Sequence, residues 1–302
     1  MLSMVLAGLL LVIPGQNAAG KRPHHESPGV AAQSPSTAEI RQGLLGLLAV
    51  ERSGRGLPAL NSAEELDAIA LAHCRDMTSR GLLTHESSDG KTYDQRLAGQ
   101  GIYFQAAGEN VASSETFLPA VVHKAFMDNP GHRANILNPE FDRVGIGVTS
   151  ADGRIYYVTQ DFLRSFVPQS PSAVREEVRR FIGRILAGKG LPALGAFPAW
   201  DNLADALAQT QAEGKARPRL AEVLGSVRVY FITTASVETA LAQFQAAAVG
   251  PYAGVSVGVA LGRDAAHPGG AYVIALLLFI TERYVHVLRD FSVGQRKTTS
   301  LE

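Results

Sequence analysis

The sequence predicts an α+β protein built from two related halves, and three features carry that prediction. Two helices are expected to begin at capping-box spacings, Ser36 with Glu39 and Ser62 with Glu65. Residues 143–162, RVGIGVTSADGRIYYVTQDF, read as two alternating strands joined by an Asp-Gly turn, which predicts a β-hairpin. The same order of landmarks returns later in the chain, so we expect a second copy of the fold.

The two halves share landmarks that occur in one order. GLPALNSAEEL begins at Gly56 and is echoed by GLPALGAFPAW at Gly190, and the later VGIGV is echoed by VSVGV. Several ordered landmarks are stronger evidence than one short match. The Pro- and Ser-rich segment LRSFVPQSPSAV separates the halves. We expect one domain over residues 36–165 and a degenerate copy over residues 172–292, which keeps the core pattern and lacks the polar clusters described below.

The N-terminus has the pattern of a secretory signal peptide over residues 1–19. An apolar run from Met4 to Ile13 is followed by Pro14 and by small residues that end near Ala19. No Lys or Arg precedes the run, and the run is too short to span a membrane. A buried N-terminal helix is the alternative interpretation. Residues 20–35 are rich in Pro, Gly and Ser and predict a flexible linker. Export would place the protein outside the cell or in the cell envelope.

Composition and charge exclude some classes of partner. Lys plus Arg equals Asp plus Glu, at 28 each, so the chain lacks the basic field that would attract nucleic acid or an anionic membrane. The apolar run from Ala271 to Ile280 is too short for a membrane span and fits a buried strand. The single cysteine, Cys74, cannot form an intrachain disulfide and is expected to be a buried filler. We expect no nucleic-acid partner and no membrane span.

Three polar clusters of the first half are candidates for chemistry. His85 follows a predicted helix end in THESS, Glu109 lies in GEN, and His132 lies in GHR. Neutral imidazoles and a carboxylate are ligands for Zn²⁺ and similar divalent ions. Alternatively, a His oriented by a carboxylate can act as a general base on water. The spacing of the three residues matches no metal-binding motif, so the residues alone leave open whether they share one site.

The combination of His85 with GENVA, NPGHRANIL and RVGIGV…YYVTQDF resembles the CAP superfamily. This family comprises cysteine-rich secretory proteins, antigen 5 and pathogenesis-related proteins, and the resemblance, over residues 37–162, is to its bacterial SCP-like branch. Gln160, in the Gln-Asp-Phe after GHRANIL, belongs to the bacterial pattern. The resemblance implies an α-β-α sandwich around an antiparallel sheet, with His85, Glu109 and His132 lining one cleft.

The chain departs from the family pattern in ways that bear on the site. Phe126 stands where many members have Trp, which affects only core packing. Asn129 stands where the fuller pattern has a second acidic residue, so the cleft loses negative charge and the case for tight metal binding weakens. Arg133 is expected to anchor a neighbouring carboxylate or carbonyl, and Gly131 to allow a tight turn. Asn110, beside the GEN carboxylate, is a further supporting residue.

The sequence leaves three functions open, and it does not decide whether the protein is an enzyme. The favoured one is a secreted binding module for a lipid, a cell-wall polymer or a protein. The second is a metal-assisted hydrolase acting on peptides, in which His85 and His132 hold Zn²⁺ or another divalent ion and Glu109 orients or deprotonates water. The third is a structural role, in which the second copy covers a face of the first and the His and Glu side chains only fasten the cleft.

Overall fold

A computed structural model describes most of the chain and divides it into two units, residues 3–166 and residues 167–302. The division falls within the Pro- and Ser-rich segment that separates the halves. The predicted linker 20–35 and residues 280–292 lie outside the described residues. The described residues are 4–7, 11–13, 36–115, 118–215, 227–238, 240–242, 252–264 and 266–279.

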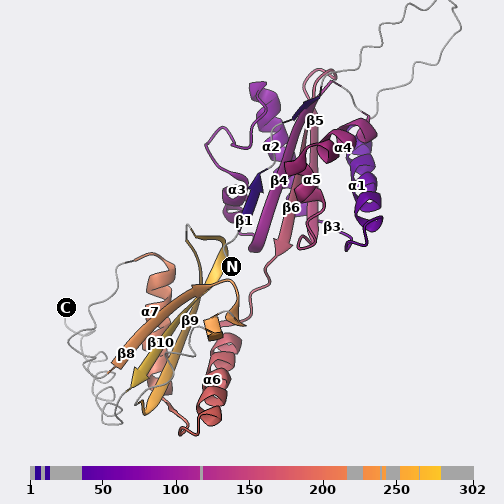
Figure 1. The fold of residues 1–302 in the computed structure, drawn as a ribbon. Helices are drawn as coiled ribbons and strands as arrows, with labels where there is room; N and C mark the ends of the chain where they lie inside the picture. The colour runs from indigo at the N-terminus through magenta and orange to yellow at the C-terminus, as the bar shows by residue number, and fades with distance from the viewer. Residues whose placement is uncertain are drawn as a thin grey trace, which may run out of the picture. The chain divides into compact units, whose positions relative to one another are not determined.

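The first unit is an α+β sandwich (Figure 1). Its helices are α1 (Thr37–Ser53), α2 (Glu64–Arg80), α3 (Tyr93–Gly99), α4 (Pro119–Asp128) and α5 (Pro130–Ile136). Its strands are β1 (Met4–Ala7), β2 (Leu11–Ile13), β3 (Asn61–Ser62), β4 (Phe104–Ser114), β5 (Arg143–Ser150) and β6 (Tyr156–Ser165). The strand order is β1-β4-β6-β5-β3, with β2 also paired to β4. The pairs β4–β6 and β5–β6 are antiparallel, so the predicted hairpin is confirmed.

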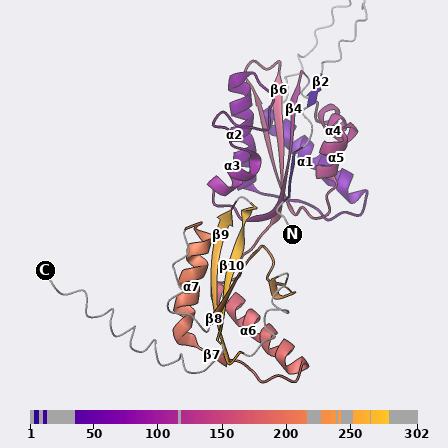
Figure 2. The ribbon, with the colours of Figure 1, turned by 60° about the vertical axis from the view of Figure 1, so that its left-hand side comes forward.

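Helices cover both faces of this sheet (Figure 2). α2 and α3 lie on one face, and α1, α4 and α5 lie on the other. Strand β5 packs closely on α2. At Gly147 the two elements are so close that an added Cβ would overlap the backbone of Ala70. The core of the second face is built from apolar side chains of α1, α4 and the sheet, among them Leu44, Phe126 and Ile146. The expected α-β-α sandwich is therefore present.

One predicted helix start is right and the other is wrong. Ser36 caps α1 in a complete capping box with Glu39. Ser62 does not cap α2, because it lies in β3. The N-cap position of α2 is Ala63, whose side chain cannot accept a hydrogen bond. The pairing of β3 with β5 takes priority, since the Ala63 N–H bonds the Val144 carbonyl.

The described parts of the N-terminus are extended. β1 and β2 run parallel to β4 along its outer edge, with Ala7 opposite Glu109 and Leu11 opposite Ala112. The alternative of a buried N-terminal helix is therefore wrong for these residues. The signal peptide over residues 1–19 stays a prediction. In the described part of the chain, no helix is long and apolar enough to cross a membrane.

The sheet of the second unit has four strands and resembles part of the sheet of the first. Its elements are α6 (Pro171–Gly188), β7 (Gly195–Ala196), α7 (Pro198–Ala212), β8 (Val227–Thr234), β9 (Gly254–Asp264) and β10 (His267–Phe279). The order β7-β9-β10-β8 has the same strand directions as β3-β5-β6-β4. Gly258 packs on Ala204 of α7, as Gly147 packs on α2. These parallels support the predicted degenerate copy. The apolar run that starts at Ala271 is buried in β10, as expected for its described residues.

The strand pairings of the two sheets show which residues of the second unit occupy the positions of the site residues of the first. Asp67 of α2 accepts from the Ile146 N–H, and Asp201 of α7 accepts from the Val257 N–H. With Ile146 aligned to Val257, the strand pairings place Val229 and Leu277 of the second unit where Glu109 and Asp161 lie in the first. The two acids at the centre of the first sheet are thus replaced by apolar residues in the second.

Candidate functional site

Glu109 is the centre of a buried polar cluster on β4. Its side chain is 1% exposed, and its Oε1 lies 2.8 Å from the His85 Nδ1. Its Oε2 forms an ion pair with the Arg96 guanidinium, and the His73 Nε2 lies 3.9 Å from the same oxygen. His85 keeps 21% of its side chain exposed. The cluster therefore joins β4 to the loop that carries His85, to α3 and to α2.

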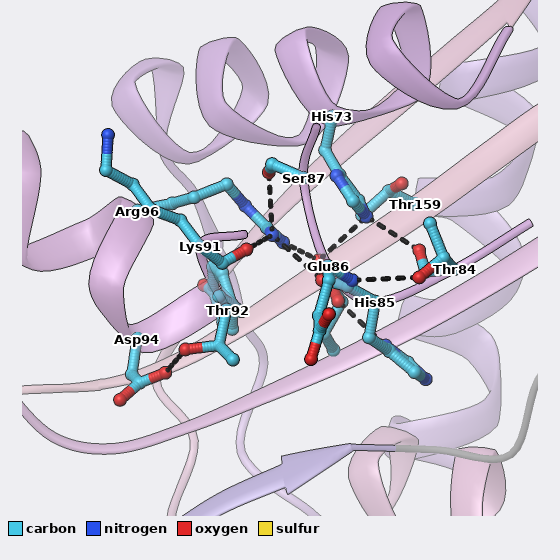
Figure 3. A network of polar contacts seen from close by, with 12 residues as sticks. His73, Thr84, His85, Glu86, Ser87, Lys91, Thr92, Asp94, Arg96 and Thr159 are labelled. Atoms are coloured by element: carbon cyan, nitrogen blue, oxygen red, sulfur yellow. Dashed lines mark hydrogen bonds and ion pairs between the residues drawn. The ribbon is translucent and has the colours of Figure 1, made fainter. Parts of the chain in front are cut away.

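Arg96 holds the His85 loop in place (Figure 3). Its Nη1 donates to the carbonyls of His85 and Lys91, at 3.0 and 3.3 Å, and lies 3.3 Å from the Ser87 hydroxyl. The same guanidinium pairs with Glu109. Sequence reasoning missed Arg96, because an Arg in a short helix after THESS matches no motif. The only available signal was its place between two candidate residues.

His132 lies on the other side of the sheet from Glu109. The Asn110 Nδ2 donates to the His132 carbonyl at 3.1 Å, and the His132 ring meets the Phe126 ring edge-on at 5.1 Å. The His132 side chain is fully buried, and neither ring nitrogen has a hydrogen-bond partner among the described residues. Burial, and then the charge of His85, lower the pKa of His132 to about 4, so its imidazole is neutral at pH 7. The structure thus joins His85 to Glu109 and leaves His132 outside that bonded cluster.

An amide network supports the site from the α5 face. The Asn110 Nδ2 also donates to the Gln160 Oε1 at 3.1 Å. Asn135 of α5 donates to the Asn110 Oδ1 at 2.8 Å and to the Glu109 carbonyl at 3.2 Å. All three amide side chains are buried. Asn135 belongs to GHRANIL but was not singled out from the sequence.

The remaining predicted residues lie in α5 or at its N-terminus. The Asn129 side chain caps α5, since it accepts from the Gly131 and His132 N–H groups. Arg133 is exposed, and it donates to the Met127 carbonyl at 3.1 Å, so the expected carbonyl anchor is confirmed. The expectation that Gly131 allows a tight turn is wrong, because Gly131 lies in the first turn of α5.

Asp161 is a buried acid that sequence reasoning missed. It stands directly opposite Glu109 in the sheet and is fully buried. Burial, and then the neighbouring Glu109 carboxylate, hold the pKa of Asp161 well above its usual range. Burial likewise raises the pKa of the nearby Cys74 thiol to about 12, so this cysteine is an inert filler, as expected. The signal for Asp161 was its place one residue after Gln160.

Comparison with known proteins assigns the first unit to a family. The model of the cysteine-rich secretory protein family, CAP, matches residues 45–162. Residues 45–162 form a CAP domain. That span contains Glu109, His85 and His132, together with Arg96 and Asp161.

Two relatives of the CAP domain come from Bacillus subtilis strain 168. The uncharacterized protein YkwD is 34% identical over 151 residues, which cover 49% of this chain and 57% of YkwD. The uncharacterized membrane protein YlbC is 32% identical over 121 residues, which cover 40% of this chain and 33% of YlbC. An extracellular SCP-domain protein of Bacillus anthracis, solved by crystallography, is 29% identical with a TM-score of 0.39, over 43% of this chain and 41% of that one. The chain thus matches little more than half of YkwD and a third of YlbC.

The donors of the CAP domain do not fit a zinc centre in their present arrangement. Zinc sites use at least three protein ligands. Among the residues that the structure describes, no group of three or more His, Cys, Asp or Glu side chains is placed to hold a metal ion. Glu109 is already paired with Arg96 and His85, and Asn129 caps a helix where a carboxylate would have added a donor.

Proposed function

We propose that the CAP domain is a binding module of an extracellular protein, with a ligand from the cell envelope or its surroundings. The observation that carries the proposal is the burial and pairing of the Glu109 carboxylate. Its carboxylate is 1% exposed and is paired through both oxygens, with His85 and with Arg96. A general base must reach the water that it deprotonates. A carboxylate enclosed in this way is better suited to holding the His85 loop and α3 against β4 than to activating water.

The surface that Glu109 fastens is the one formed by the His85 loop and α3. Arg96 connects both to β4, and each contact is charge-assisted or made to a backbone carbonyl. Binding sites are commonly loops held by a rigid scaffold. The leader pattern of residues 1–19 supports an extracellular location for such a module.

The proposal is tested by sedimentation with two envelope materials, isolated cell-wall sacculi and phospholipid vesicles. We expect the secreted protein to sediment with one of them, and the His85→Ala/His132→Ala variant to sediment with an affinity within about threefold of it, because neither imidazole is exposed enough to dominate a surface contact. Circular dichroism shows that the variant is folded. A wild-type protein that binds neither material would contradict the binding proposal. Loss of sedimentation in the folded variant would contradict the expectation that the rest of the loop and α3, and not the imidazoles, make the contact.

A hydrolase is the second candidate, and the His85–Glu109 pair favours it. An imidazole held by a carboxylate at 2.8 Å, and partly exposed, has the arrangement of an oriented general base. The test is cleavage of casein and of a fluorogenic peptide library, with calorimetry for Zn²⁺, Mg²⁺ and Ca²⁺. A binding module gives equal background for wild type and His85→Ala. Cleavage that falls by about a hundredfold or more in His85→Ala would replace the binding proposal with the hydrolase.

A further inference from the structure

The outer edge of β4 is occupied by strands from the N-terminus. β6 pairs with the inner edge of β4 along its whole length. On the outer edge, Met4–Ala7 of β1 pair in parallel with residues 106–109, and Leu11–Ile13 of β2 pair in parallel with residues 112–114 (Figure 1). α5 lies beside β1, and α4 lies beside β2. Both occupying strands belong to residues 1–19, which have the pattern of a leader that is cut off during export.

Removal of the leader would leave β4 as an edge strand without protection. An edge strand presents unpaired N–H and C=O groups, and proteins usually blunt such an edge with a short strand, a charge, a Pro or a bulge. Residues 106–114, AAGENVASS, contain no Lys, Arg or Pro, and they pair with β6 without a shift of register. Their single charge, Glu109, is enclosed in the buried cluster with His85 and Arg96. The edge of β4 therefore depends on a covering strand.

The other edge strands of the two sheets are blunted. β3 and β7, at one edge of each sheet, are 2 residues long. β8 takes the place of β4 in the second unit, and among the described residues no strand pairs with its outer side. β8 carries Arg228, which is exposed, as is usual for an edge strand that faces water. β4 lacks such a charge, so it differs from its counterpart in being suited to accept a further strand.

The residues of β4 favour an aliphatic occupant. On the face of the sheet that α5 covers, β4 carries the small residues Ala106, Gly108 and Ala112, and the two alanines belong to an apolar core cluster. Small residues on one strand leave room for larger side chains on the next strand. The segments that now lie on this edge, MVLA and LVI, are uncharged and rich in the aliphatic residues that favour strands. An extended aliphatic peptide therefore fits the edge.

We infer that, once the leader is cut off, the outer edge of β4 accepts an extended aliphatic peptide segment of a partner protein, which adds a strand parallel to β4 in the place of β1 and β2. The backbone of residues 106–114 makes the main contact, as in other cases of strand addition, and α4 and α5 flank the added strand. This site is distinct from the surface proposed above, because it uses the backbone edge of β4 and not the His85 loop or α3.

The test uses the secreted protein, whose first residue is determined by mass spectrometry, and a fluorescent peptide of residues 3–14 with a short lysine tail for solubility. We expect the peptide to bind and to slow the hydrogen exchange of amides within residues 106–114 by about tenfold or more, with no change in residues 227–234 of β8. The control peptide carries Val5→Pro and Leu6→Pro. Because adjacent amides point to opposite edges of a strand, one of the two lost N–H groups faces β4, and binding should weaken by about tenfold or more.

The full-length chain, produced without export so that it keeps residues 1–19, provides a matched comparison. Its own β1 and β2 compete with the peptide, and a tethered segment acts at an effective concentration of about a millimolar. We expect the full-length chain to bind the peptide at least about tenfold more weakly than the secreted protein does. The two proteins have the same CAP domain, so the difference reports the occupation of the β4 edge.

Several results would overturn the strand-addition site. They are a secreted protein that still carries residues 4–13, no peptide binding at about 100 μM, unchanged exchange of residues 106–114, and equal affinity for the control peptide or for the full-length chain. If the protein still sediments with sacculi or vesicles in any of these cases, the binding function proposed above stands and only the β4 site is wrong. If it sediments with neither, that function fails as well.

Discussion

Replacing Glu109 with Gln should cost a large share of the stability of the CAP domain. The change keeps the shape of the side chain and removes its charge. Arg96, with 10% of its side chain exposed, would then be a guanidinium without its carboxylate in a buried place. Breaking a buried ion pair by removing one partner costs about 3–5 kcal/mol. Because Arg96 keeps the carbonyls of His85 and Lys91 as acceptors, we expect about 3 kcal/mol, at the lower end of that range.

The matched control is Glu140→Gln. Glu140 pairs with Arg164 at 2.9 Å, but the two side chains are 53% and 35% exposed. Exposed pairs contribute about 0–1 kcal/mol, so this variant should unfold almost as wild type does. The difference between the two variants isolates burial, since the chemical change is the same.

Urea unfolding provides the assay. Far-UV circular dichroism follows the whole chain, and the fluorescence of Trp200, the single tryptophan, follows the second unit. We expect Glu109→Gln to lower the midpoint of the dichroism transition and to leave the Trp200 transition nearly unchanged. Hydrogen exchange of residues 84–91 should rise in the same variant, because their anchor on β4 is weakened. A loss below about 1 kcal/mol, no larger than that of Glu140→Gln, would refute the role given to the ion pair.

Three further predictions test the burial on which the site depends. The raised pKa of Asp161 gives stability that is present at low pH and is lost as pH rises above about 4, so Asp161→Asn should flatten the fall of the urea midpoint with rising pH. His132, with a pKa of about 4, should keep the nuclear magnetic resonance shifts of a neutral ring at pH values well above 4, and titration near the ordinary histidine value would contradict its burial. Gly147→Ala should lower the thermal midpoint sharply, because its Cβ overlaps α2, whereas Gly183→Ala in a helix with open space should raise stability by about 0.5–1 kcal/mol; equal effects would contradict the close packing of β5.

The sequence was sufficient for the features that depend on local pattern. Ser36 and Glu39 identify a helix start because their contact is made within one turn. The β5–β6 hairpin follows from alternation and a turn, and its register needs no distant information. Ser62 shows the limit of such reasoning. The same local pattern failed there because pairing with β5, far along the chain, holds Ser62 and Ala63 in extended backbone, so the helix begins one residue later with Ala63 at its N-cap.

The cluster around Glu109 could be predicted only in part, because its members meet across the sheet and across elements. The motifs indicated His85 and Glu109 as candidates, and the structure joins them. Arg96 and Asp161 carry no motif, since an ion pair and a cross-strand neighbour are set by tertiary packing and register. The position of His132, on the opposite face from Glu109, follows from the alternation of β4, in which Glu109 and Asn110 point to opposite sides.

The second unit helps to separate what the sheet needs from what the site needs. At the places of Glu109 and Asp161 it carries Val229 and Leu277, and its sheet has the same order. Apolar replacement of buried charges is often neutral or stabilising, so the fold does not require the acids. The segment from α7 to β8 is also shorter than that from α2 to β4, which holds the His85 loop and α3. The charged cluster thus accompanies the long segment that carries the His85 loop and α3, which is the relation expected if the cluster is kept to hold a binding surface in shape.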